Sequence, residues 1–146
     1  MTRPTPLMRS DFRVHTAMPT RWFDNDVYGH MNNTVHYLLF DTAVNGFLMQ
    51  HGILKPTGGA TIFLVVESGC SYFSEMAFPD VITVGLSISQ LGSSSVRYQI
   101  GLFREDAETA AAQGHFVHVN VDRQARRPIP IPDAARATLS TLCQPS

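Results

Sequence analysis

The chain has 146 residues, of which 44% are hydrophobic and 16% are charged, which is enough apolar material for one compact core and too little length for two ordinary domains. The net charge of -1 and the pI near 6.6 disfavour nucleic acid and acidic membranes as partners, because both usually require an excess of basic residues. We therefore predict a single domain over residues 1–146 that binds neither nucleic acid nor a membrane.

The cysteine content and the N-terminal composition indicate in which cellular compartment the protein is expected. Cys70 and Cys143 are the only cysteines, and their spacing matches neither a disulfide framework nor a zinc motif. The first ten residues contain arginine and proline but no continuous apolar stretch, so they do not resemble a secretory signal. No run of about twenty apolar residues could span a membrane. These features favour a cytoplasmic protein.

The first half of the chain predicts a strand, a polar loop and a long helix. Side chains alternate weakly over residues 12–18, and the polar, turn-rich run 24–33 follows. Apolar residues then recur at helical spacing, with Asn32 or Asn33 as the N-cap and Gly52 as the stop signal. Because its apolar residues extend well beyond one face, we expect this helix of about five turns to be covered on most sides.

The second half predicts strands joined by short polar connections. The strand signals are a continuous apolar run at 62–66, alternation at 82–88 and 96–102, and a shorter alternation at 117–121. The connections are short enough for antiparallel neighbours, and residues 134–142 can form a closing helix. One long helix followed by an antiparallel meander predicts an α+β fold.

The densest cluster of reactive side chains lies directly before the long helix, in residues 21–33 (RWFDNDVYGHMNN). The start of a helix presents unpaired backbone N–H groups and partial positive charge, which can polarise a carbonyl oxygen. Asp26 lies beside these donors, where its carboxylate could activate water or attack a carbonyl carbon itself. This loop is therefore the candidate site.

Several neighbours of Asp26 also have an ordinary structural explanation. Asp24 and Asn25 are most simply loop residues, because Asp and Asn are common in turns and before helices. His30 is either a structural histidine bonded to the loop backbone or a contact to the substrate. Asp41 and Glu67 are kept as reserve carboxylates, ranked below Asp26.

The stretch DNDVYGHMNNTVHYLLFDTAVN, with the pattern Asp-x-Asp-x-x-Gly-His-x-Asn-Asn before an aromatic-rich helix, resembles the 4-hydroxybenzoyl-CoA thioesterase-like families of the hot-dog superfamily. The resemblance implies an antiparallel sheet of about five to six strands wrapped around a long central helix. It also implies homo-oligomers, dimers or dimers of dimers, that share active sites across their interface and hydrolyse an acyl-CoA to a free acid and CoA. No cofactor beyond the CoA of the substrate is expected.

The resemblance also assigns roles to individual residues. The catalytic aspartate falls on Asp26, and the amide that polarises the thioester carbonyl falls near Asn33. Relatives often have tyrosine at His36, which leaves open whether His36 or Tyr37 reaches the pocket. The candidate catalytic residues are Asp26, His30 and Asn33, and the candidate substrate-binding residues are Gly29, Asn32, Tyr37, Ser94 and Ser95. Ser94 and Ser95 are equally well explained as a polar hairpin turn.

Metal binding and two other functions are the alternatives to this prediction. His115 and His118 are three apart in a predicted strand and so point to opposite faces, which predicts no metal site there. A hot-dog hydratase or dehydratase acting on acyl thioesters is the alternative enzyme, with His30 as its possible histidine. A non-catalytic acyl-CoA-binding module is the alternative outside enzymes, because a fold does not guarantee turnover.

Overall fold

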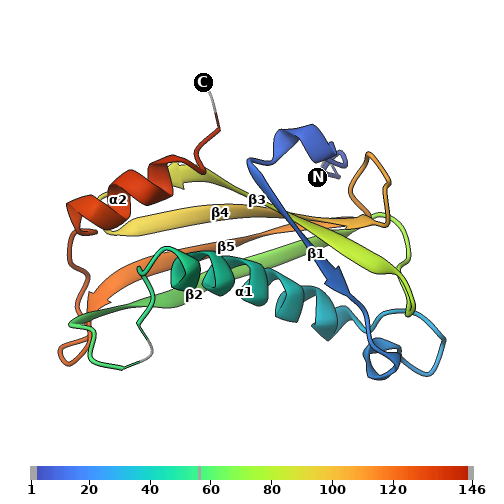
Figure 1. The fold of residues 1–146 in the computed structure, drawn as a ribbon, viewed down its shortest axis with the longest axis horizontal. Helices are drawn as coiled ribbons and strands as arrows, with labels where there is room; N and C mark the ends of the chain where they lie inside the picture. The colour runs from blue at the N-terminus through green and yellow to red at the C-terminus, as the bar shows by residue number, and fades with distance from the viewer. Residues whose placement is uncertain (1–2, 56, 145–146) are drawn as a thin grey trace.

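The computed structural model describes residues 3–55 and 57–144 (Figure 1). Its five strands form one antiparallel sheet in the order β1-β3-β4-β5-β2, as the α+β hot-dog prediction requires. The elements are β1 (Val14–Pro19), α1 (Asn33–Gln50), β2 (Thr61–Tyr72), β3 (Val81–Leu91), β4 (Ser95–Arg104), β5 (Ala112–Asp122) and α2 (Asp133–Ser140), with short 3-10 turns at Arg9–Asp11 and Trp22–Asp24. Neither described helix is long and apolar enough to cross a membrane.

Helix α1 begins and ends at the residues that its sequence signals. The side chain of Asn32 accepts a hydrogen bond from the backbone N–H of Thr34, and Gly52 follows the helix with a φ of +71°. Phe40, about two turns after the start of α1, is fully buried and packs edge-on against Phe116 of the sheet at 6.0 Å between ring centroids. Gly114 makes room for this contact, because a Cβ there would lie 2.6 Å from the Phe40 ring.

One face of helix α1 is open to solvent in the single chain. Leu38 and Met49 are 56% and 54% exposed, although both belong to the apolar set that predicted a helix covered on most sides. The prediction that the helix is covered on most sides is therefore wrong for the single chain. The sheet covers α1 from one side only, because the five strands form a single sheet and α1 packs on it against β3, β4 and β5.

The opposite face of the sheet carries a second, smaller core. Gly85 of β3 and Gly101 of β4 are register partners, and the ring of Phe12 lies on both. A Cβ on Gly101 would lie 2.6 Å from the Phe12 ring, so only glycine permits this close approach. Phe12 also meets Phe103 edge-on at 5.7 Å between ring centroids. The N-terminal segment is thereby attached to the sheet.

Strand β2 is longer than the sequence predicts. The apolar run 62–66 marks only its first half, and pairing with β5 continues to Tyr72 through the polar sequence ESGCSY. The register shifts between Val65 and Glu67, so Glu67 lies inside the strand at a bulge and does not end it. Hydrogen bonding to β5 extends the strand where hydrophobic periodicity gives no signal.

Candidate active site

A cavity of about 350 Å³ lies at the N-terminal end of α1. Three segments that are distant in sequence form its walls: the loop before α1, the first turn of α1, and the end of β2 with the residues that follow it. The lining residues are Asp26, His30, Met31, Asn33, His36, Tyr72, Phe73, Ser74, Glu75 and Met76. The predicted catalytic residues Asp26, His30 and Asn33 therefore share one pocket.

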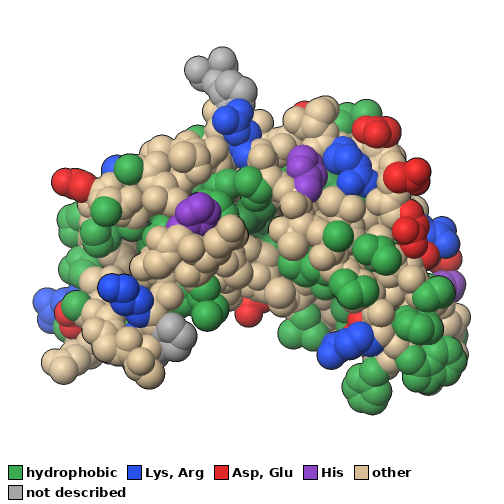
Figure 2. Space-filling model, viewed as in Figure 1, with side chains coloured by type: hydrophobic (Ala, Val, Ile, Leu, Met, Phe, Trp, Pro, Cys, Tyr) green, Lys and Arg blue, Asp and Glu red, His purple; other side chains and the backbone are tan. Residues whose placement is uncertain are grey.

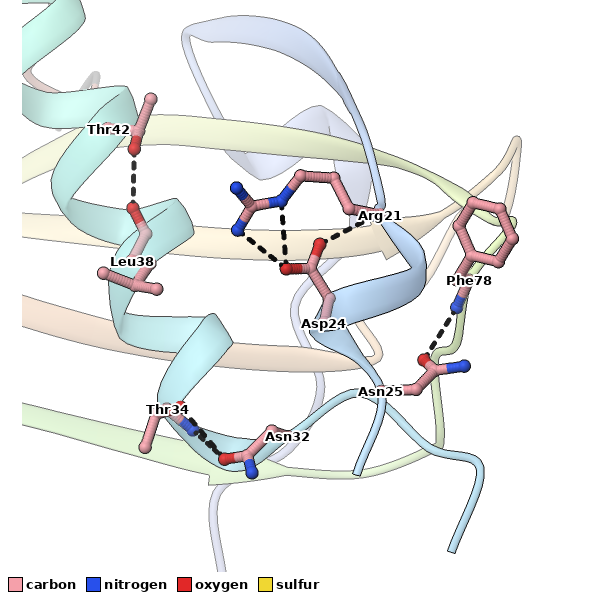
Figure 3. A network of polar contacts seen from close by, with 8 residues as sticks. All are labelled: Arg21, Asp24, Asn25, Asn32, Thr34, Leu38, Thr42 and Phe78. Carbon is pink, nitrogen blue, oxygen red and sulfur yellow. Dashed lines mark hydrogen bonds and ion pairs between the residues drawn. The ribbon is translucent and has the colours of Figure 1, made fainter. Parts of the chain in front are cut away.

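Asp24 and Asn25 hold the loop in place (Figure 3). The buried carboxylate of Asp24 accepts hydrogen bonds from the backbone N–H of Arg21 at 2.8 Å and from its guanidinium at 2.9 and 3.2 Å. Asn25 Oδ1 accepts the backbone N–H of Phe78 at 2.9 Å. Both side chains stabilise the loop conformation, as expected for ordinary loop residues.

Backbone hydrogen bonds also hold the loop against the segment after β2. The backbone N–H of the buried Met31 donates to the carbonyl oxygen of Met76 at 2.7 Å, and the N–H of Asn32 donates to the carbonyl oxygen of Asp24 at 2.8 Å. These bonds place residues 72–76 beside the start of α1. The sequence did not predict that residues 72–76 belong to the site, because no local pattern indicates a contact between residues more than forty positions apart.

Asp26 uses one carboxylate oxygen to fix its own loop. Its Oδ1 accepts the backbone N–H groups of Tyr28 at 2.8 Å and His30 at 3.3 Å. Gly29, with a φ of +81°, donates to the Asp26 carbonyl oxygen at 3.1 Å and allows the chain to turn. Among the hydrogen bonds of the described residues, none uses Oδ2 of Asp26. One oxygen is positioned and the other is available to a substrate or a water molecule.

The helix start keeps one backbone donor unused. Asn32 Oδ1 accepts the N–H of Thr34 at 3.0 Å, and the carbonyl oxygen of Asn32 accepts the N–H of Val35 at 2.9 Å. Within the described chain no acceptor takes the backbone N–H of Asn33, which lines the pocket. This N–H lies at the positive end of the helix dipole, where a developing negative charge on oxygen is stabilised.

Of the two adjacent aromatic residues His36 and Tyr37, only His36 lines the pocket. Its ring lies 4.7 Å from that of Tyr72, centroid to centroid. Burial lowers the pKa of His36 and raises the pKa of Tyr72 to about 12, so both side chains are neutral near pH 7. Tyr37 packs against Phe40 and Phe116 and does not reach this cavity.

His30 is paired across the rim of the pocket. Its Nε2 lies 3.1 Å from Oε2 of Glu75, and both side chains are substantially exposed. The pairing gives His30 a side-chain partner in addition to its backbone contact with Asp26. Glu75 is a site residue that the sequence did not indicate, because it reaches the pocket through long-range contacts such as the backbone hydrogen bond from Met31 to Met76.

Large apolar side chains are exposed on the loop that forms one wall of the pocket. Trp22, Phe23, Val27 and Tyr28, all in the loop before α1, are between 77% and 92% exposed. Figure 2 shows hydrophobic surface gathered at the lower right, the end of the molecule where Figure 1 places this loop. An exposed apolar patch of this kind marks a surface that binds another molecule.

Ser94 and Ser95 are not brought together with Asp26 in the single chain. Ser94 lies in the turn between β3 and β4 and Ser95 begins β4, and the carbonyl oxygen of Ser94 accepts the backbone N–H of Asn120 at 2.7 Å. This turn is at the C-terminal end of α1, whose 18 residues span about 27 Å. In one chain the two serines therefore serve the hairpin turn.

The reserve carboxylates Asp41 and Glu67 lie outside the pocket. Asp41 is exposed on α1 and accepts a hydrogen bond from Asn45 at 2.9 Å. Glu67 forms ion pairs with Arg97 at 3.1 Å and His115 at 2.8 Å on the face of the sheet away from α1. Asp26 is the only one of the three predicted carboxylates that lines this cavity.

The two histidines of β5 face opposite sides of the sheet, as their spacing predicts. His115 contacts Glu67, whereas His118 is buried against Phe63 and Tyr98. Within residues 3–55 and 57–144, no three His, Cys, Asp or Glu side chains are close enough together to hold a metal ion.

Comparison with solved structures shows the same fold in bacterial proteins. The PA5185 protein of Pseudomonas aeruginosa is 44% identical, with a TM-score of 0.93 over 97% of this chain and 99% of that one. A predicted thioesterase from Bacillus stearothermophilus is 25% identical, with a TM-score of 0.77 over 90% and 98% of the two chains. Slr0204 of Synechocystis, a 1,4-dihydroxy-2-naphthoyl-CoA thioesterase, is 15% identical, with a TM-score of 0.79 over 86% and 94%.

Comparison with protein families gives the same result over most of the sequence. No curated protein matches the chain. The model of the thioesterase-like superfamily matches residues 20–139, which include the Asp26 loop, all of α1 and strands β2 to β5. Thioester hydrolysis is thus the general reaction that family and fold support. The chain belongs to the thioesterase-like superfamily and has the hot-dog fold.

Proposed function

We propose that the protein is an acyl-CoA thioesterase, which hydrolyses an acyl-CoA to a free acid and CoA. The observation that supports this most directly is that one pocket contains two groups without a hydrogen-bond partner. Asp26 Oδ2 and the backbone N–H of Asn33 both lack a partner among the described residues, and both residues line the cavity. A carboxylate and an oxyanion donor are the two groups that thioester hydrolysis requires.

In the proposed reaction the N–H of Asn33 donates to the thioester carbonyl oxygen. Asp26 then removes a proton from a water molecule as the water oxygen attacks the carbonyl carbon, and the C–S bond breaks to release the thiolate of CoA. The alternative is direct attack by Asp26, which forms an acyl-aspartate anhydride that water hydrolyses in a second step. A thiolate is a good leaving group, so neither route requires a strong general acid.

The other candidate residues would position these two groups. Asn32 caps the helix and leaves the Asn33 N–H free, while Gly29 provides the turn that directs Asp26. His30, paired with Glu75 at the rim, is placed to contact the substrate as it enters. The neutral pair His36 and Tyr72 forms a wall that suits an uncharged acyl group.

We also propose that two copies associate through strand β2. This strand is one of the two edges of the sheet, and its consecutive residues Leu64, Val65 and Val66 are exposed. A long apolar edge strand is rare in a monomer, because its free backbone groups pair readily with another strand. Light scattering should give the mass of a dimer or of a dimer of dimers at micromolar concentration. A monomer with full activity would contradict this proposal.

The experiment that tests the proposed function follows CoA release with a thiol-reactive dye. The panel contains short-chain, long-chain and aromatic acyl-CoA thioesters, with the matching enoyl-CoA thioesters followed by absorbance for hydration. We expect CoA release from at least one class and no hydration. Hydration without CoA release would indicate the hydratase, and saturable binding with neither reaction would indicate a non-catalytic binding module.

A further inference from the structure

The N-terminal segment of the chain reaches the end of strand β2, beside the candidate active site. Phe12 attaches this segment to the face of the sheet away from α1 (Figure 1). The side chain of Gln113 of β5 then holds it twice: Oε1 accepts the backbone N–H of Leu7 at 2.7 Å, and Nε2 donates to the carbonyl oxygen of Thr5 at 3.0 Å. Arg3, two residues further toward the N-terminus, is thereby placed at the end of β2.

Arg3 makes two contacts with consecutive residues there. Its Nη2 donates to the carbonyl oxygen of Tyr72 at 2.6 Å, and its guanidinium carbon lies 5.6 Å from the centroid of the Phe73 ring. A guanidinium within about 6 Å of an aromatic ring is attracted by the electrons of the ring face. Arg3 thus holds the backbone of one residue and the side chain of the next.

The two residues that Arg3 contacts line the Asp26 pocket. Tyr72 and Phe73 are both wall residues of that cavity, and the Tyr72 ring lies edge-on to the ring of His36 at 4.7 Å between centroids. Arg3 itself does not line the cavity. A change at Arg3 therefore reaches the pocket through Tyr72 and Phe73.

The end of β2 has little other support, because this strand is an edge of the sheet. The backbone N–H groups of Phe73 and Ser74 donate to the carbonyl oxygen of Ala111 at 2.8 and 3.1 Å. In a trans peptide the C=O of one residue and the N–H of the next point in opposite directions. The carbonyl oxygen of Tyr72 therefore points away from Ala111 to the open edge, where Arg3 is its donor.

The catalytic groups of the proposed reaction are held without Arg3. The carboxylate of Asp26 is fixed by the N–H groups of Tyr28 and His30, and Asn33 begins a helix that Asn32 caps. Loss of Arg3 should therefore loosen one wall of the pocket and leave the base and the oxyanion donor in place. Contacts made equally in the bound substrate and in the transition state affect KM and not kcat.

We propose that Arg3 is a positioning residue, which fixes the wall formed by Tyr72 and Phe73 against the acyl group of the substrate. Its kinetic consequence rests on the proposed thioesterase activity. Its structural consequence, a well-ordered end of β2, is measurable in the free protein.

Arg9 provides a matched control on the same N-terminal segment. Its guanidinium donates to the carbonyl oxygens of Ala107 at 2.8 and 3.1 Å and Glu105 at 2.8 Å, and it lies 5.0 Å from the centroid of the Phe103 ring. These are the same two kinds of contact, but none of these residues lines the Asp26 pocket. Arg3→Ala and Arg9→Ala therefore remove the same chemistry at the pocket and away from it.

The kinetic test uses an acyl-CoA and the N-acetylcysteamine thioester of the same acid, which lacks the phosphates of CoA. For Arg3→Ala on acyl-CoA we expect KM to rise about fivefold, the size of one lost hydrogen bond, with kcat within about twofold of wild type. The loss of kcat/KM should be equal for both thioesters. Arg3→Lys should recover part of it, because an ammonium can still donate to the carbonyl oxygen of Tyr72, and Arg9→Ala should match wild type. A loss confined to the CoA thioester would show that Arg3 contacts the phosphates and would overturn the positioning role.

Hydrogen exchange in the free protein separates this proposal from the proposed function. In Arg3→Ala the amides of Phe73 and Ser74 should exchange at least about fivefold faster than in wild type and in Arg9→Ala, because the end of β2 opens more often. Faster exchange in a protein whose wild type hydrolyses no thioester would refute the proposed function and leave the structural role of Arg3 intact. Unchanged exchange at both amides would overturn the proposal for Arg3, whether or not the protein is active.

Discussion

Asp26→Asn is expected to slow CoA release by about a hundredfold or more, the size typical of losing a positioned general base. The amide keeps an oxygen that can accept the N–H groups of Tyr28 and His30, so the loop geometry is maintained. It cannot remove a proton from water or attack the thioester carbon. We therefore expect the loss in kcat, with little change in KM, measured by dye-coupled CoA release on the best substrate of the panel.

The matched control is Asp41→Asn, which makes the same chemical change on the exposed side of α1. Asp41 lies outside the pocket, and its side chain accepts a hydrogen bond from Asn45. This variant should retain activity within about twofold of wild type. Equal rates for Asp26→Asn and wild type would eliminate Asp26 as base and as nucleophile, and would move the search to His30 and Glu75.

The stability of the folded protein should fall by about 2 kcal/mol between pH 7.5 and pH 5 because of His118 alone. Burial lowers the pKa of this histidine from 6.5 to about 4, and the nearby Asp41 only partly opposes the shift. Between pH 6.5 and 4 the unfolded chain binds a proton at this position that the folded chain does not bind. The free energy of unfolding therefore decreases as the pH is lowered through this window.

Urea unfolding of wild type and His118→Phe at both pH values measures this effect. The variant should lose most of the pH dependence, because phenylalanine has no proton to bind and suits the aromatic neighbours Phe63 and Tyr98. Tyr98→Phe is the control in the same cluster: burial raises the pKa of Tyr98 further above its usual alkaline range, so its loss leaves the slope unchanged. An unchanged slope in His118→Phe would show that His118 is not held neutral.

The sequence predicted helix α1 and the alternating strands well, because their signals are local. Asn32 and Gly52 mark the helix ends by backbone chemistry that acts within one turn. Strands β3 and β4 alternate because one face of each packs against α1 and the other does not. The same locality explains the candidate loop, where Asp26, Gly29 and the helix start are consecutive.

What the sequence by itself determined is therefore the α+β order of elements, the caps of α1 and the loop that carries Asp26. The tertiary structure alone decided that Tyr72 and Glu75 face this loop, that His36 and not Tyr37 lines the pocket, and that Ser94 lies at the other end of the sheet. The physical reason is the distance along the chain between the residues that interact. Caps and periodicity depend on neighbours within a few residues, whereas strand pairing and loop ties such as Met31 to Met76 join residues that no local pattern connects.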